Sequence, residues 1–76
     1  MQKVTVCING IEAVKDFVCK AQMCKFDIDI ARDRYVVDAK SLMGVFSLDC
    51  SKPLELTMHT DDATEFVKAI EDYIIK

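Results

Sequence analysis

The chain has 76 residues, of which 51% are hydrophobic and 30% are charged, and its formal net charge at pH 7 is −3. This length accommodates one hydrophobic core, so we expect a single domain over residues 1–76. The basic residues are scattered singly, which argues against nucleic-acid binding, because neutralising phosphates requires clustered Lys and Arg side chains. No apolar run is long enough to span a membrane and no secretory signal is evident, so the sequence predicts a soluble cytoplasmic protein.

The N-terminal segment predicts a strand followed by a helix. Residues 4–8 alternate and are rich in β-branched side chains, which is typical of a half-buried strand. Asn9-Gly10 ends this strand, and from residue 11 the apolar residues follow a helical period. We therefore expect a helix over about residues 11–24. Its buried stripe consists of Val14, Phe17, Val18 and Ala21, flanked by Ile11 and Cys24.

The remaining elements follow in close succession. Residues 26–30 alternate strictly between apolar and acidic, Arg32-Asp33-Arg34 supplies a turn, and residues 35–38 return as the partner strand. A short helix follows within residues 39–48, then a loop over 49–53 and a fourth strand over 54–58. The last predicted helix spans about residues 61–75, with capping side chains at 60–62. Its expected buried face is Ala63, Phe66, Val67, Ile70, Tyr73 and Ile74.

The element order β-α-β-β-α-β-α predicts an α+β fold. Each strand presents apolar side chains to one face and polar side chains to the other, so helices can cover one face while water covers the second. We expect a two-layer open-faced β-sandwich, in which a four-stranded antiparallel sheet carries all the helices on one face.

Four cysteines, at positions 7, 19, 24 and 50, raise the question of disulfides or a metal site. In a cytoplasmic protein we expect all four thiols to be reduced. Cys19 and Cys24 are five residues apart, which fits neither a C-x-x-C pair nor an i, i+4 pair of helical ligands. We therefore expect no metal site and no cofactor. His59, the single histidine, is expected to be a surface residue without a functional role.

Residues 39–48 are the best candidate for a functional surface. Ser41 is placed to cap a short helix, which contains no charged residue. Met43 and Phe46 lie on one side of that helix, and Leu42 and Val45 lie on another. A helix this short buries only one stripe, so one of these two apolar pairs is expected to face solvent or a partner.

Residues 37–48, Val-Asp-Ala-Lys-Ser-Leu-Met-Gly-Val-Phe-Ser-Leu, resemble the regulatory-serine segment of HPr, the histidine-containing phosphocarrier of the phosphoenolpyruvate-dependent sugar phosphotransferase system. Gly10-Ile11 and residues 17–21 resemble the start and middle of the family's first helix, and the family has the same element order. The resemblance implies that Ser41 is a regulatory phosphorylation site for an HPr kinase. It also implies that other protein partners of this bacterial-type system dock on Leu42, Met43 and Phe46.

The chain departs from the family at the segment that carries the phosphoryl group. In HPr proteins a histidine, an arginine and a proline follow the glycine, whereas here Gly10-Ile11-Glu12 leads into a segment that is two residues shorter. A phosphohistidine site needs an imidazole beside free N–H groups at a helix start, together with a cation. Glu12 is instead expected to stabilise the helix start through the dipole. The chain therefore resembles a divergent HPr without the active-site histidine.

The resemblance predicts a regulatory, protein-binding module that is neither an enzyme nor a phosphocarrier. One alternative is a phosphocarrier with an unusual acceptor, either His59 or Glu12. Another is a small α+β domain of ferredoxin-like type that binds a ligand or uses a thiol, with Cys7 or Cys19 as the reactive residue.

Overall fold

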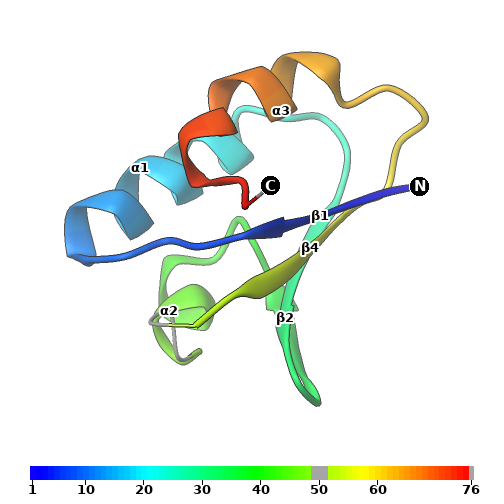
Figure 1. Cartoon of the computed structure of the whole chain (residues 1–76). Helices are drawn as coiled ribbons and strands as arrows, with labels where there is room; N and C mark the ends of the chain where they lie inside the picture. The colour runs from blue at the N-terminus through cyan, green and yellow to red at the C-terminus, as the bar shows by residue number, and fades with distance from the viewer. Residues whose placement is uncertain (49–51, 76) are drawn as a thin grey trace.

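The computed structural model describes residues 1–48 and 52–75. Its elements occur in the predicted order, with a short 3-10 helix, η1, added at the end (Figure 1). They are β1 (Gln2–Val6), α1 (Ile11–Gln22), β2 (Ile28–Arg32), β3 (Tyr35–Asp38), α2 (Leu42–Phe46), β4 (Leu54–Met58), α3 (Thr64–Ala69) and η1 (Glu71–Tyr73).

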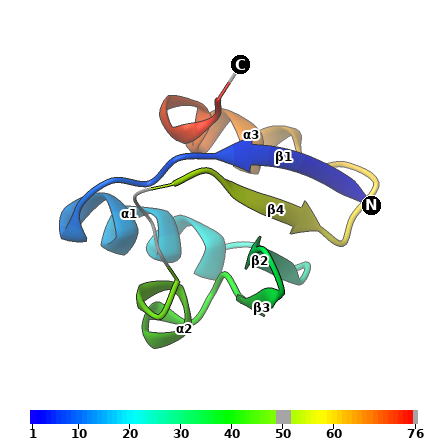
Figure 2. The same cartoon turned by 60° about the horizontal axis from the view of Figure 1, so that its bottom comes forward.

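The sheet has four antiparallel strands in the order β1-β4-β2-β3. Leu56 of β4 lies opposite Val4 on one side and Ile30 on the other, so apolar side chains of neighbouring strands share one face. In both views α1 lies between α3 and α2 in the helical layer (Figure 1, Figure 2). The predicted α+β open-faced sandwich is confirmed.

The core lies between the sheet and this helical layer. Four residues of α1 face it, and they are the predicted stripe: Val14, Phe17, Val18 and Ala21. The Phe17 ring is fully buried, with its centroid 6.1 Å from that of Phe66 and 6.4 Å from that of Tyr73. Burial of an aromatic ring of this size is among the larger single contributions to the stability of a small domain.

Two predicted boundaries near the first hairpin are wrong by two residues. The helix ends at Gln22 instead of residue 24, and β2 begins at Ile28 instead of Phe26. Phe26 precedes the strand, and its ring packs edge-on against Phe66, with centroids 6.4 Å apart. Ile11, expected at the edge of the buried stripe, is 63% exposed because it lies in the first turn, at the rim of the molecule.

The predicted last helix is also too long. Within the predicted range 61–75, only α3 is α-helical. The 3-10 helix η1 follows it, and the backbone becomes extended at Ile74. It then runs beside β1, where the Cys7 N–H donates to the Tyr73 carbonyl at 2.7 Å and the Ile75 N–H donates to the Thr5 carbonyl at 2.9 Å. These long-range bonds replace the helical ones, so tertiary structure overrides the local periodicity.

The N-cap residue of α3 is Ala63, which provides no side-chain cap, but the preceding Asp62 supports the start of the helix. The Asp62 side chain accepts hydrogen bonds from the Thr64 N–H at 3.0 Å and from the Thr64 hydroxyl at 2.6 Å. These bonds lower the pKa of Asp62, and the bond from the Thr64 hydroxyl has the larger effect. The predicted loop residues 49–51, with Cys50 among them, lie outside the described residues, as does residue 76.

The described cysteines, Cys7, Cys19 and Cys24, are free thiols. None of the helices in the described part of the chain is both long and apolar enough to cross a membrane.

Candidate functional site

Ser41 begins α2 as a side-chain cap. Its backbone is extended, with φ −100° and ψ 111°, and its Oγ accepts a hydrogen bond from the Gly44 N–H at 3.2 Å. The Ser41 carbonyl accepts a second bond, from the Val45 N–H, at 3.0 Å. The predicted N-cap is confirmed, and a cap of this kind stabilises a helix by about 1 kcal/mol.

Two hydrogen bonds hold the start of α2 against the C-terminal end of α1. The Gln22 side-chain amide donates to the Lys40 carbonyl at 2.9 Å, and the Lys40 ammonium donates to the Cys24 carbonyl at 3.0 Å. The Asp38 carboxylate shapes the turn before them by accepting from the Lys40 N–H at 2.9 Å. A cation at this end of α1 also interacts favourably with the helix dipole.

α2 has a buried side and an exposed side. Val45 is fully buried, whereas Met43 is 80% exposed and Phe46 is 40% exposed. Leu42, the third candidate docking residue, packs partly against the core, on the same side of the helix as Val45. Met43 and Phe46 therefore form an exposed apolar pair three residues apart, which we call the α2 surface.

The start of α1 is built differently. Gly10 precedes the helix at φ 97° and ψ 156°, a backbone conformation open essentially to glycine alone, and it offers no side-chain cap. Glu12 lies exposed in the first turn. Its carboxylate is near the positive end of the helix dipole, but it makes no hydrogen bond to the described N–H groups there.

The structure does not bring the candidate residues into one site. Lys40, next to Ser41, contacts the C-terminal end of α1, while Gly10 lies at the N-terminal end, roughly 18 Å away along a helix of twelve residues. His59 follows β4 beside Gln2, whereas Gly10 follows the other end of β1. The five-residue ladder between them spans roughly 17 Å.

His59 lies at the surface and pairs with a residue of another strand. Its ring Nε2 lies 2.8 Å from the Asp29 carboxylate of β2, and its backbone N–H donates to the Asp27 carbonyl at 2.9 Å. The two residues are 30 positions apart in sequence, so only the pairing of β2 with β4 brings them together. The histidine thus joins two strands at the solvent face of the sheet.

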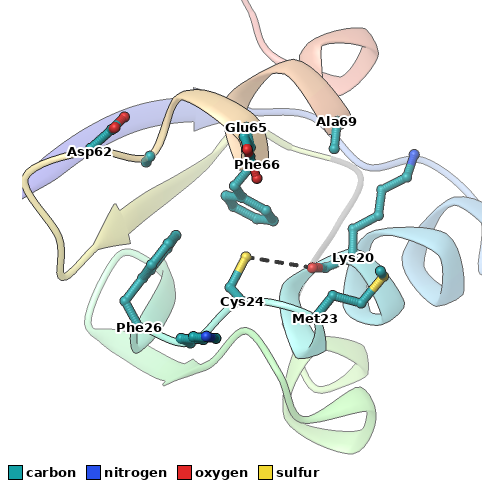
Figure 3. Close-up of a pocket in the computed structure, with 10 residues that line it drawn as sticks. Lys20, Met23, Cys24, Phe26, Asp62, Glu65, Phe66 and Ala69 are labelled. Atoms are coloured by element: carbon teal, nitrogen blue, oxygen red, sulfur yellow. Dashed lines mark hydrogen bonds between the residues drawn. The ribbon is translucent and has the colours of Figure 1, made fainter.

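A hollow of about 530 Å³ lies between the end of α1 and the start of α3 (Figure 3). Phe26 and Phe66 form its apolar wall, and the thiol of Cys24 points toward it while donating to the Lys20 carbonyl at 3.6 Å. Burial raises the pKa of Cys24, which disfavours the reactive thiolate. The residues that line the hollow carry charges of both signs, from Lys20, Lys25, Asp62 and Glu65.

A charged network that the sequence did not reveal covers the outer side of α1. The Tyr73 hydroxyl donates to the Asp16 carboxylate at 2.7 Å, and the Lys20 ammonium lies 2.8 Å from the same oxygen. The bond to Asp16, with some burial, raises the pKa of Tyr73 to about 12. Bonds from Lys20 and then Tyr73 lower the pKa of Asp16. The i, i+4 spacing of Asp16 and Lys20 was a visible signal, but the partner Tyr73 was not.

Within residues 1–48 and 52–75, His, Cys, Asp and Glu side chains form no group of three or more that could hold a metal ion.

Comparison with known proteins supplies a family. Residues 3–76 match a family model described as "PTS HPr component phosphorylation site". The structure is similar to that of HPr-C-His from Thermoanaerobacter tengcongensis, with a TM-score of 0.80 and 32% identity over 95% of this chain and 89% of that one. It is also similar to the phosphocarrier protein HPr of Bacillus anthracis, with a TM-score of 0.74 and 32% identity over 97% and 94% of the two chains.

The histidine-containing phosphocarrier protein of a Mycoplasma shares only the fold, with a TM-score of 0.75 and 17% identity over 93% of this chain and 89% of that one. The family model and the two relatives at 32% identity establish the family as well as the fold, because they cover almost the whole sequence. The chain belongs to the HPr family of the phosphotransferase system.

Proposed function

We propose that this chain is a regulatory HPr-family protein of the cytoplasm, which binds protein partners through the α2 surface and does not carry phosphoryl groups from phosphoenolpyruvate. The observation that carries the proposal is the pair Met43 and Phe46, exposed on a helix whose start is capped by Ser41. A flexible Met beside an aromatic ring is a combination favoured at adaptable protein-binding surfaces. The proposed partners are proteins of the phosphotransferase system, and we expect no enzymatic activity.

The start of α1 supports the second half of the proposal. Phosphoryl transfer through a histidine needs an imidazole beside the free N–H groups of a helix, where the phosphate can be held. The residues at this helix start are Gly10, Ile11 and Glu12, and the Glu12 carboxylate is an anion that repels an incoming phosphate. His59, the single histidine, is at the opposite end of the sheet and bonded to Asp29.

We also propose Ser41 as a site of regulatory phosphorylation by an HPr kinase. Ser41 is exposed, and no acidic side chain lies in the first turn of α2 to repel a phosphate. The hydroxyl is already aligned with the helix by its bond from the Gly44 N–H, so a phosphate attached to it lies near the positive end of the helix dipole. Phosphorylation there adds charge beside the α2 surface and offers a way to switch docking.

Two phosphorylation reactions test the proposal on the whole chain. In the first, the protein is incubated with Enzyme I and phosphoenolpyruvate, and we expect no acid-labile phosphate on it. In the second, it is incubated with an HPr kinase and ATP, and we expect acid-stable phosphate that is lost in Ser41→Ala but retained in Ser47→Ala, a matched serine at the other end of α2. Acid-labile phosphate in the first reaction overturns the proposal, and its loss in His59→Ala would identify the acceptor.

Docking is tested separately with the same kinase as the binding probe. Met43→Ser and Phe46→Ser should weaken binding by about fivefold to thirtyfold each, because an exposed apolar anchor contributes on the order of 1–2 kcal/mol to an interface. Met23→Ser is the control, since Met23 is equally exposed but lies at the end of α1. Equal losses in the control and the α2 variants would show that the α2 surface is not the docking site.

A further inference from the structure

The two edges of the sheet are treated differently. Beside β1, residues 73–75 occupy the C-terminal part of the outer edge, through the bonds of Tyr73 and Ile75 to Cys7 and Thr5 and through a bridge between Val6 and Ile74. No described segment pairs with the outer edge of β3. Open edges are places where a second strand can add, and proteins usually cover or charge them.

The register of the hairpin shows which groups of β3 face outward. Arg32 lies opposite Tyr35 across a two-residue turn, Ile30 lies opposite Val37, and the Ala39 N–H donates to the Ile28 carbonyl at 2.9 Å. In an antiparallel pair, every second residue directs its N–H and C=O toward the neighbouring strand. Residues 35, 37 and 39 therefore bond to β2, and Val36 directs both of its backbone groups away from the sheet.

The side chains at this edge are apolar and accessible. Val36 is 62% exposed and Tyr35 is 72% exposed, although both lie in a sheet strand. The centre of the edge carries no charge. A charged side chain stands two residues to each side of Val36, with Arg34 before it and Asp38 after it. The charges are opposite in sign and placed symmetrically.

We propose that a second copy of this chain pairs antiparallel with β3, centred on Val36, so that the two sheets join into one. In this register the N–H and C=O groups of the two Val36 residues bond to each other. Arg34 of each copy lies opposite Asp38 of the other, and both charge pairs are favourable. The edge is thus complementary to itself, which is what a two-fold symmetric contact requires.

The proposed dimer is weak. Only four residues form β3, so the contact falls below the ~1,200 Å² of a stable interface, and we expect a dissociation constant on the order of 100 µM. It does not use Met43, Phe46 or the start of α1. The inference therefore stands apart from the proposed function, and either can fail without the other.

Sedimentation equilibrium of the whole chain, from about 20 µM to about 2 mM, tests the proposal. We expect mostly monomer at the lower end and mostly dimer at the upper end. Val36→Lys should weaken dimerisation at least about tenfold, because it places two like charges opposite each other on the symmetry axis. Thr5→Lys is the matched control on β1, where the edge is already paired, and should leave dimerisation unchanged. Circular dichroism verifies that each variant is folded.

The predicted register is tested by exchanging the charges. Arg34→Asp alone and Asp38→Arg alone should each weaken dimerisation about fivefold, since each creates two like-charge pairs. An equimolar mixture of the two variants should recover the wild-type affinity within about twofold, because every pair is again of opposite sign. Lack of recovery in the mixture overturns the register. A monomer at all concentrations, or a dimer lost in Met43→Ser but kept in Val36→Lys, overturns the proposal and in the latter case assigns the contact to α2.

Discussion

α1 and α2 are both short surface helices beside the same core, but they are held in place by different means. α1 has twelve residues, buries four apolar side chains and begins at a glycine that provides no side-chain cap. α2 has five residues, buries only Val45 fully and begins at a serine whose hydroxyl accepts from the Gly44 N–H. The longer helix is secured along its length, and the shorter one at its start.

The difference explains which residues of each helix are free to change without loss of the helix. Burial along α1 is enough to fix the helix, so the first-turn N–H groups can remain free of a side-chain cap. A helix of five residues is less stable, because few hydrogen bonds offset the entropy lost when its first turn forms. In α2 the exposed Met43 and Phe46 contribute little to folding and are available for contacts, while Ser41 stabilises the start of the helix.

The largest expected effect comes from breaking the packing of α1. Phe17→Ala should lower the free energy of unfolding by about 3–5 kcal/mol, because it removes a fully buried ring that contacts Phe66 and Tyr73. Met43→Ala on α2 should change it by less than about 0.5 kcal/mol, since this side chain is exposed. Urea unfolding followed by circular dichroism measures both. A comparable loss in the two variants would contradict the distinction between the helices.

An intermediate effect is expected at the helix starts. Ser41→Ala should lower the free energy of unfolding by about 1 kcal/mol, because the Gly44 N–H loses its acceptor. Ser41→Asn should restore most of it, since Asn also accepts at an N-cap. Asn9→Ala, in the exposed approach to α1, should change it by less than about 0.5 kcal/mol. The same urea titration checks all three, and a larger loss at Asn9 than at Ser41 would reverse the comparison.

The smallest effect concerns the pH dependence of the contact between α1 and Tyr73. The folded-state pKa of Tyr73 is raised to about 12, so the stabilisation from its bond to Asp16 is fully present below the ordinary value of 10.0 and is lost as pH rises through about 12. Asp16→Asn should move the tyrosine pKa down toward its ordinary value. Titration of the Tyr73 ring by NMR measures it.

Asp16 produces the opposite pH dependence. Its lowered pKa means that its contribution is present above the ordinary value of 3.8 and is lost as pH falls through the folded-state value. Solvent screening keeps this contribution small. An unchanged Tyr73 titration in Asp16→Asn would show that the hydrogen bond does not form in solution.

Much of the fold could be predicted because local pattern and tertiary structure agree. The bounds of β3 and β4 match the predicted ranges, because the alternation in β4 coincides with the buried face of the sheet and β3 follows directly from the two-residue turn after β2. The start of α2 was predictable from one residue, because a serine before a short apolar run has few other roles. Predictions failed where a distant segment competes with the local pattern. Phe26, predicted in a strand, packs its ring against Phe66, and Ile74, predicted in a helix, pairs with Val6 of β1.

The candidate residues were predictable as a set, but their separation was not. No local pattern shows that Lys40 reaches the C-terminal end of α1, or that His59 meets Asp29 across two strands. These contacts follow from the strand order, in which β4 inserts between β1 and β2. Sequence patterns therefore identified the chemistry of single residues, but only the structure shows how far apart these residues lie.

The pairing of β1 on both sides affects the order in which the chain can fold during synthesis. β1 emerges from the ribosome first, yet its partners are β4 and residues 73–75, which emerge much later. Its backbone groups must stay hydrated, or held by a chaperone, until nearly the whole chain is available. A nascent chain that stops before residue 73 presents two open edges to its neighbours instead of one, and is correspondingly exposed to aggregation on the polysome.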